Sequence, residues 1–223
     1  MHRKARMAAA ILFFLTTIAL GQDGHFDVSV NGAGVFTKES NGNGIAQSAT
    51  NGANFFGTFR VKFKAKHSLL FNYGRAKNTQ IHQSSSAFDF HILAKATEYT
   101  GAYAYTPFQK GRFAPFVLAG AGALIFSPRD TVLVVADVSN NVISRFETSI
   151  GAAKQTEIAF LYGVGVDYRL PVFSRLSLRL QYRGLFYNAP DFKVDASSGN
   201  SLSLSTGARG HMAEPSIGLV FRF

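Results

Sequence analysis

The chain has 223 residues, no cysteine and a formal net charge of +10 at pH 7. This length suits one domain or at most two, and the absence of cysteine excludes disulfides and a lipid anchor attached through a cysteine. The positive excess could suit anionic lipid headgroups or nucleic acid, but without a basic cluster or a nucleic-acid motif we expect no nucleic-acid partner.

Residues 1–21 have the pattern of a secretory signal peptide. Basic residues precede an apolar stretch from Met7 to Leu20, and the small residue Gly21 follows it. The stretch is too short to cross a membrane as a helix, which argues against the alternative of a retained membrane anchor. We expect cleavage after Gly21 and a single mature domain over residues 22–223.

Beyond the signal, apolar and polar residues alternate in a series of segments. Such alternation indicates β-strands, since successive side chains of a strand point to opposite faces. No later stretch approaches the roughly 18 consecutive apolar residues of a membrane-spanning helix. The expected strands are 25–36, 54–64, 68–73, 88–108, 113–126, 158–168, 176–187 and 211–223.

The fourth of these segments changes parity along its length. Phe90 and Ile92 share one face, whereas Tyr99 and Tyr103 share the opposite one. One extra residue in a strand produces such a change, so we predict a β-bulge near residues 93–96.

Short and long connections alternate strictly between the segments. The short ones are 65–67, 107–112 and 169–175, and the long ones are 37–52, 75–87, 127–155 and 188–207. A soluble sandwich or barrel needs no such alternation, whereas an outer-membrane barrel has short periplasmic turns, long outside loops, an even strand count and an apolar, aromatic outer face. The sequence therefore predicts an all-β fold, an eight-stranded antiparallel up-and-down transmembrane β-barrel in the bacterial outer membrane.

The last strand carries a second indication of the same environment. Ser216, Gly218, Phe221 and Phe223 form a polar, glycine, aromatic, aromatic pattern that resembles the C-terminal insertion signal of Gram-negative outer-membrane barrels. The whole mature chain resembles the small eight-stranded barrels of the OmpA transmembrane-domain and OmpX kind. This resemblance implies a monomer surrounded by outer-membrane lipid and lipopolysaccharide, with its last strand read by the barrel-insertion machinery. It does not specify an activity.

Charged residues fall on the face opposite to the apolar one, which places them in the lumen. An Arg or Lys on the lipid face at mid-membrane would cost roughly 2–4 kcal/mol. Because the interior of eight strands is only wide enough for side chains, these charges must pair there. The expected lumen set is Asp27, Arg60, Lys62, Lys64, Glu98, Asp167, Arg179, Arg183, Glu214 and Arg222.

Strand direction predicts which of these charges meet. The expected pairs are Asp27 with Arg222, Asp167 with Arg179, and Glu214 with Arg183. We interpret the network as packing that closes the lumen. The alternative is a switchable plug, in which an arginine exchanges carboxylate partners and opens a narrow channel for ions or small solutes.

Enzyme activity is a weaker hypothesis. His82 and Ser84, with Asp89 and His91 nearby, have a His-x-Ser spacing that resembles outer-membrane lipid A deacylases, where a serine nucleophile needs a histidine base within hydrogen-bond reach. Those enzymes carry the motif on the barrel wall, whereas here it falls in an expected, serine-rich loop. We therefore expect no enzyme, no catalytic residue, no cofactor and no metal site.

Passage of small apolar molecules through the wall, as in OmpW-like barrels, is a further alternative. It would need an apolar lumen, and the inward charges argue against it.

The connection 127–155 is unusual among the long loops. Its apolar runs 131–138 and 142–150 flank a Ser-Asn-Asn turn, which predicts a hairpin that continues the fifth and sixth strands above the membrane. A second interpretation is a protruding edge that pairs with a strand of another protein. The expected role of the chain is thus envelope integrity or surface interaction through four outside loops.

Overall fold

The computed structural model describes residues 25–84, 88–139, 142–150, 153–195 and 201–223. Residues 1–24 lie outside this range, so the signal peptide remains a prediction. Within the described ranges, no helix is long and apolar enough to cross a membrane.

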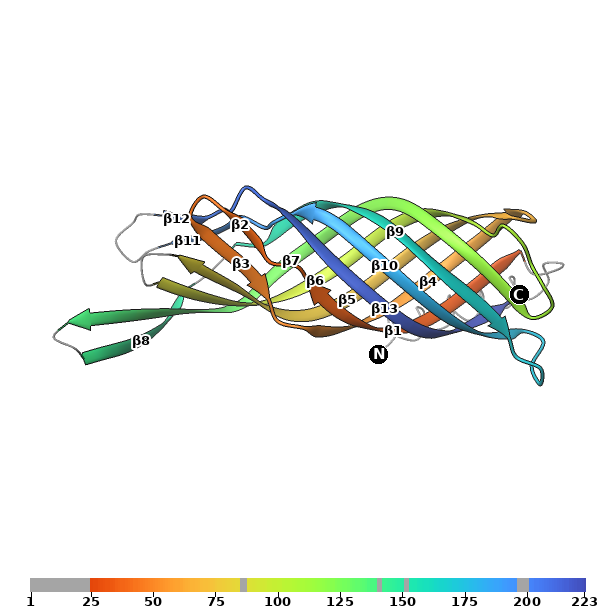
Figure 1. Cartoon of the computed structure of the whole chain (residues 1–223), viewed down its shortest axis with the longest axis horizontal. Helices are drawn as coiled ribbons and strands as arrows, with labels where there is room; N and C mark the ends of the chain where they lie inside the picture. The colour runs from red at the N-terminus through yellow and green to blue at the C-terminus, as the bar shows by residue number, and fades with distance from the viewer. Residues whose placement is uncertain (1–24, 85–87, 140–141, 151–152, 196–200) are drawn as a thin grey trace, which may run out of the picture.

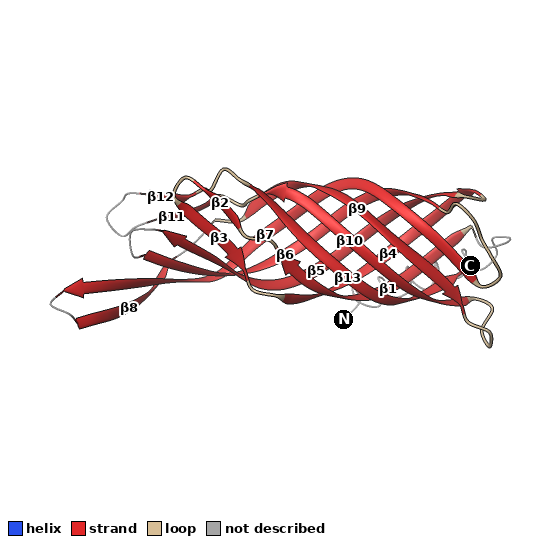
Figure 2. Cartoon of the chain, in the orientation of Figure 1, coloured by secondary structure: helices blue, strands red, loops and turns tan. Residues whose placement is uncertain are grey.

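Eight long strands close into a barrel with antiparallel neighbours throughout (Figures 1 and 2). The ring is completed where β5 pairs with β6, and the first strand pairs with the last. Closure leaves no strand edge in the wall, as a barrel in lipid requires. The predicted eight-stranded fold is confirmed. Its strands are β1 (Phe26–Thr37), β4 (Gly52–Lys64), β5 (His67–Ser84), β6 (Phe88–Tyr105), β7 (Phe113–Ser139), β9 (Gln155–Arg169), β10 (Leu176–Asn188) and β13 (Arg209–Arg222).

The two ends of the barrel differ. At one, which we call the turn end, short connections join β4 to β5, β6 to β7 and β9 to β10. At the other, the loop end, the chain forms further strands, and β7 with β8 extends farthest from the barrel (Figure 1). These strands are β2 (Ser40–Gly42), β3 (Ile45–Ala49), β8 (Val142–Ile150), β11 (Phe192–Asp195) and β12 (Ser201–Leu204).

The expectation that the long connections are loops was wrong in part. β5 continues to Ser84 and pairs there with β3 and with β6, so residues 75–84 are strand. Residues 37–52 contain β2 and β3. Both segments are polar on both faces, so they lack the apolar alternation that marks the membrane part. The hairpin predicted in 127–155 is confirmed by the pairing of β8 with β7.

The described side chains of the barrel strands mostly alternate between the outside and the interior. Apolar residues face outward, and Val30, Phe55 and Ile158 are 67%, 71% and 78% exposed. A water-soluble protein would bury such residues. The interior instead holds buried Asp, Glu, Arg, Asn and Thr side chains. The chain is therefore inverted relative to a soluble barrel.

The interior changes character along the barrel axis. Charged and polar groups fill the turn end and the middle, whereas the loop end is closed by an apolar cluster that includes Leu124, Phe126, Leu161, Leu185 and Phe192. The sequence analysis treats the whole lumen as polar, and that expectation was wrong for this section. In this section the sheet surrounds a hydrophobic core.

The predicted bulge lies at the expected height but in the neighbouring strand. The pairing of β6 with β7 shifts between Leu93 and Ala94, which face Asp130 and Pro128, so the extra residue is Arg129 of β7. β6 itself keeps its alternation, with Ile92 and Ala94 buried. The apparent parity change arises because apolar residues of β6 turn inward where the interior becomes apolar.

Candidate functional site

Buried charges in the barrel form two separate clusters. The turn-end cluster contains Asp27 of β1, Arg60 and Lys62 of β4, Asp167 of β9 and Arg179 of β10. Asp167 accepts hydrogen bonds from two arginines, whereas Asp27 accepts one from Lys62 and forms a longer ion pair with Arg60. Register explains the arrangement, since Arg60 lies opposite Asp27 and Arg179 lies opposite Asp167.

Asp167 is the centre of this cluster. Arg179 donates to its two oxygens through Nε at 2.7 Å and Nη2 at 3.0 Å, a two-pronged contact. Arg60 Nη1 donates to Asp167 Oδ2 at 3.0 Å and lies 3.9 Å from Asp27 Oδ2. Lys62 Nζ donates to Asp27 Oδ1 at 2.9 Å. A buried charge needs such partners to offset the loss of water.

The two guanidinium groups share one aromatic support. The Cζ atoms of Arg60 and Arg179 lie 4.7 and 5.1 Å from the ring centroid of Phe116, which is buried. At these distances the ring face attracts both cations. Phe116 was not identified from the sequence, because glycine and alanine make the facing of its strand ambiguous.

The second cluster, which we call the mid-barrel cluster, pairs one cation with two acids. Arg183 donates to Glu98 through Nη1 at 3.1 Å and Nη2 at 2.8 Å, and Nη2 also donates to Glu214. Asn54 donates to Glu214 Oε1 at 2.7 Å, so an amide helps to hold the second acid. The Arg183 Cζ atom lies 3.7 Å from the ring centroid of Phe56.

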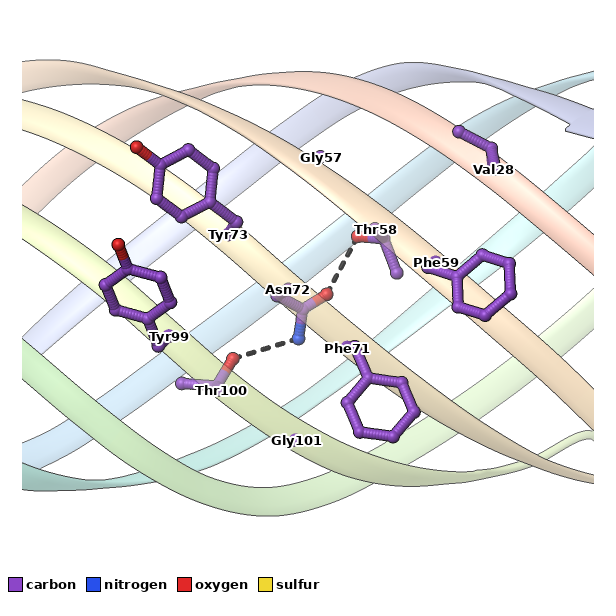
Figure 3. Close-up of a pocket in the computed structure, with 10 residues that line it drawn as sticks. All are labelled: Val28, Gly57, Thr58, Phe59, Phe71, Asn72, Tyr73, Tyr99, Thr100 and Gly101. Carbon is purple, nitrogen blue, oxygen red and sulfur yellow. Dashed lines mark hydrogen bonds between the residues drawn. The ribbon is translucent and has the colours of Figure 1, made fainter. Parts of the chain in front are cut away.

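A chain of hydrogen bonds through uncharged side chains ends at Glu98 of the mid-barrel cluster. Thr58 donates to Asn72 at 2.8 Å, Asn72 to Thr100 at 3.0 Å, and Thr100 to Glu98 at 2.7 Å. Figure 3 shows the first two of these contacts across β4, β5 and β6. The polar side chains of this chain thus form hydrogen bonds with one another.

The outer wall is hollowed above this chain (Figure 3). The hollow measures about 640 Å³ and forms where Gly57 and Gly101 present no side chain beside Phe71 and Tyr99. Because it belongs to the apolar outer face, we assign it no chemistry.

The structure pairs two of the three predicted couples. Arg179 lies opposite Asp167 and Arg183 opposite Glu214, and both couples form ion pairs. Arg222 lies opposite Asp27 in the register, but no ion pair joins them among the described residues, and that partner assignment was wrong. Lys62 and Arg60, on the strand on the other side of Asp27, bind it instead.

Lys64 also departs from its predicted place. It is exposed at the turn end, just after an irregularity in the pairing of β4 with β5 between Lys62 and Lys64. The irregularity interrupts the alternation that would have turned Lys64 inward. The side chain lines the mouth of the barrel rather than its core.

Residues of the predicted insertion signal have clear packing roles. Ser216 donates to the carbonyl of Gln181 at 3.1 Å, and the Phe221 and Phe223 rings lie 4.8 Å apart. A Cβ on Gly218 would lie 2.6 Å from the backbone carbonyl oxygen of Val30, which favours glycine there. Their recognition by an insertion machinery remains a prediction.

The catalytic hypothesis gains no geometry from the structure. His82 is 1% exposed, packs edge-on against Phe192, and neither of its ring nitrogens has a hydrogen-bond partner in the described part of the chain. His82 lies nine residues beyond Tyr73 on β5, outside the membrane part, and burial lowers its pKa to about 4. The side chains of Ser84, Asp89 and His91 lie outside the described residues.

Metal binding also gains no support. Within the described ranges, no group of three or more His, Cys, Asp or Glu side chains is arranged to hold a metal ion.

Comparison with known proteins reveals similarity in structure but not in sequence. No protein-family model matches the chain, and no curated protein sequence matches it. The outer membrane protein OprG from Pseudomonas aeruginosa is 13% identical, with a TM-score of 0.56 over 90% of this chain and 96% of that one.

Two further solved structures give the same result. A major outer membrane protein from Thermus thermophilus is 12% identical, with a TM-score of 0.53 over 89% of this chain and 99% of that one. The outer membrane protein AlkL, solved in lipid bilayers, is 15% identical, with a TM-score of 0.51 over 90% of this chain and 92% of that one. At these identities the similarity concerns the fold alone.

Proposed function

We propose that this chain, which has the fold of the small eight-stranded outer-membrane barrels, resides in the bacterial outer membrane as a closed barrel and acts at the cell surface through its loop end. The membrane location is supported by two observations. The outer face of the barrel is apolar, and the buried charged side chains lie in the lumen. In this orientation the turn end faces the periplasm and the loop end faces outward.

The observation that carries the proposal of a closed barrel is the filling of the interior at successive levels. Arg179 and Arg183 are among the most completely buried large side chains, and Phe126, Leu161 and Leu185 are fully buried beyond them at the loop end. An interior of eight strands has room for little beyond side chains. A solute would have to displace both ion-pair clusters and an apolar core to pass.

A surface role is supported by the blade formed by β6, β7 and β8 at the loop end. β8 pairs with β7 from Val142 to Ile150, and its other edge has no strand partner within the described ranges. An exposed strand edge offers backbone donors and acceptors to a strand of another protein. Structural support of the envelope is the complementary part of this role.

The proposal includes its surroundings. Outer-membrane lipid and lipopolysaccharide would contact the apolar wall, the chain would be a monomer, and the barrel-insertion machinery would read β13. We include no catalysis, since His82, the base of the candidate pair, has no hydrogen-bond partner for either ring nitrogen among the described residues.

The first test is conductance of the refolded protein in a planar bilayer. A folded barrel, identified by heat-modifiable migration on a gel, is expected to give no current. Steady current from the wild-type protein would favour the channel alternative and contradict the closed lumen. An altered lipid A mass spectrum on overexpression would instead favour an enzyme.

The surface role is tested separately with a loop deletion. Cells that display the protein are compared with cells that display a variant lacking residues 132–145, and a deletion of residues 193–203 from the other hairpin serves as the control. Adhesion to a protein-coated surface should fall only with the first deletion. Equal adhesion of all three would remove the blade from the proposal.

A further inference from the structure

The turn end of the barrel contains a cavity of about 250 Å³ that the closed-lumen proposal does not use. It lies at the mouth, between the turns that follow β4 and β6 and the ends of β9 and β13. Its lining is strongly basic. The basic side chains are Arg60, Lys62, Lys64, Lys66, Arg169 and Arg222, joined by His67.

The positive charge of this lining is not neutralised locally. Asp167 is the acid that lines the cavity, and it is bound by Arg179 as well as by Arg60. Even with Asp27, which binds Lys62 from behind, the lining cations outnumber the acids by four. Several cations around a partly enclosed space create a field that attracts an anion.

Buried donors without partners provide a second, independent observation. Arg60 is only 4% exposed, and although its Nη1 binds Asp167, its Nε and Nη2 have no hydrogen-bond partner among the described residues. The Nε of Arg222 is also buried and has no hydrogen-bond partner among the described residues. A buried donor without a partner is unfavourable, so an acceptor bound in the cavity would satisfy these groups.

We propose that this cavity binds an anion of the phosphate class that carries at least two negative charges. Arg60 and Arg222 supply planar guanidinium donors, which match phosphate oxygens, and Lys64 and Lys66 supply mobile positive charge at the entrance. At about 30 Å³ for each water molecule, the space equals about eight waters, enough for a diphosphate group and part of its hydration. The inference is independent of the surface role proposed for the other end.

Sodium pyrophosphate serves as the probe, titrated calorimetrically into the refolded chain in an uncharged, phosphate-free detergent at fixed ionic strength. The test variant is Lys64→Gln with Lys66→Gln, because both residues are exposed at a turn and their loss should not prevent folding. The matched control is Lys77→Gln with Lys154→Gln, which removes the same charge from exposed sites outside the cavity.

Wild-type protein and the control pair should bind pyrophosphate with equal affinity, and the Lys64/Lys66 variant should bind at least tenfold more weakly. No binding by the wild-type protein, or equal binding by all three, would overturn the proposal. Reconstitution with and without cardiolipin, whose headgroup carries two phosphates, then identifies the source. If this lipid competes with pyrophosphate only when Lys64 and Lys66 are present, a headgroup occupies the site. If it does not compete, the ligand is a free anion.

Discussion

Arg183 and Glu98 are joined by two hydrogen bonds, of 3.1 and 2.8 Å, in the middle of the barrel, although 85 residues separate them in the chain. The same guanidinium also binds Glu214. The Arg183 side chain of β10 thus joins β6 and β13. Its contribution to stability can be tested.

Replacement of Arg183 by Met should destabilise the barrel by about 3–5 kcal/mol, because Glu98 and Glu214 would remain buried without their cation. Urea unfolding, followed by loss of heat-modifiable migration, measures the change. The triple variant Arg183→Met, Glu98→Gln, Glu214→Gln removes all three charges and should recover most of the stability. An Arg183→Met protein as stable as the wild type would show that the cluster contributes nothing to folding.

The two charge clusters should behave independently. Arg179 and Arg183 are four residues apart on β10, about 13 Å, and their ion pairs share no partner. Free energies of unfolding for Asp167→Asn and Arg183→Met should therefore add within about 0.5 kcal/mol. Asp167→Asn combined with Arg179→Met, within one cluster, should deviate clearly from additivity. Strong coupling between the clusters would contradict their independence.

Gly218→Val should block barrel closure. A Cβ at this position would lie 2.2 Å from Asn31 Oδ1 and 2.6 Å from the carbonyl oxygen of Val30, on the seam between β13 and β1. Gly101→Val is the control, since a Cβ there meets nothing within 4 Å. Refolding in detergent without any cellular machinery is the measurement. If Gly218→Val refolds normally there yet fails to accumulate in cells, its role is recognition rather than packing.

The loop-end core should loosen as the pH falls from about 6.5 to 4. His82 has a pKa of about 4 in the folded chain and 6.5 in the unfolded one, so the unfolded state takes up the proton first and stability is lost as acid is added. The full loss is at most about 3 kcal/mol. Hydrogen exchange in β3 and the outer part of β5 measures it. His82→Phe should remove the pH dependence; an unchanged dependence in that variant would assign it to another group.

The membrane part of the fold was predictable because lipid imposes a strict pattern. Every outward residue must be apolar, so the alternation around Phe55 and Phe59 and the contrast of short and long connections identify the strands. The loop end lacks this constraint, and apart from the hairpin in 127–155 its strands were missed. One signal was present there: Asn43 and Gly44 both adopt positive φ, the Asn-Gly turn typical of a hairpin.

The charged interior was predictable in position but only partly in pairing. Tight turns fix the register, so Asp167 and Arg179 could be matched from sequence. Asp27 has a neighbour on each side, Arg60 and Arg222, and sequence alone does not say which one reaches it. The contacts across the lumen, such as Arg60 with Phe116, depend on how the ring curves and have no counterpart in the linear pattern.

Pairing of β1 with β13 also determines the order of assembly. These are the first and last strands of the barrel in chain order, so the ring cannot form before β13 has been synthesised. Until then β1 and β10 each present an open edge, and the ion pairs that cross the lumen have no enclosed space in which to form. A chain that ends before β13 would therefore be much less stable than its share of the barrel strands suggests. The open edges of β1 and β10 must therefore be kept from pairing with other strands until β13 is available.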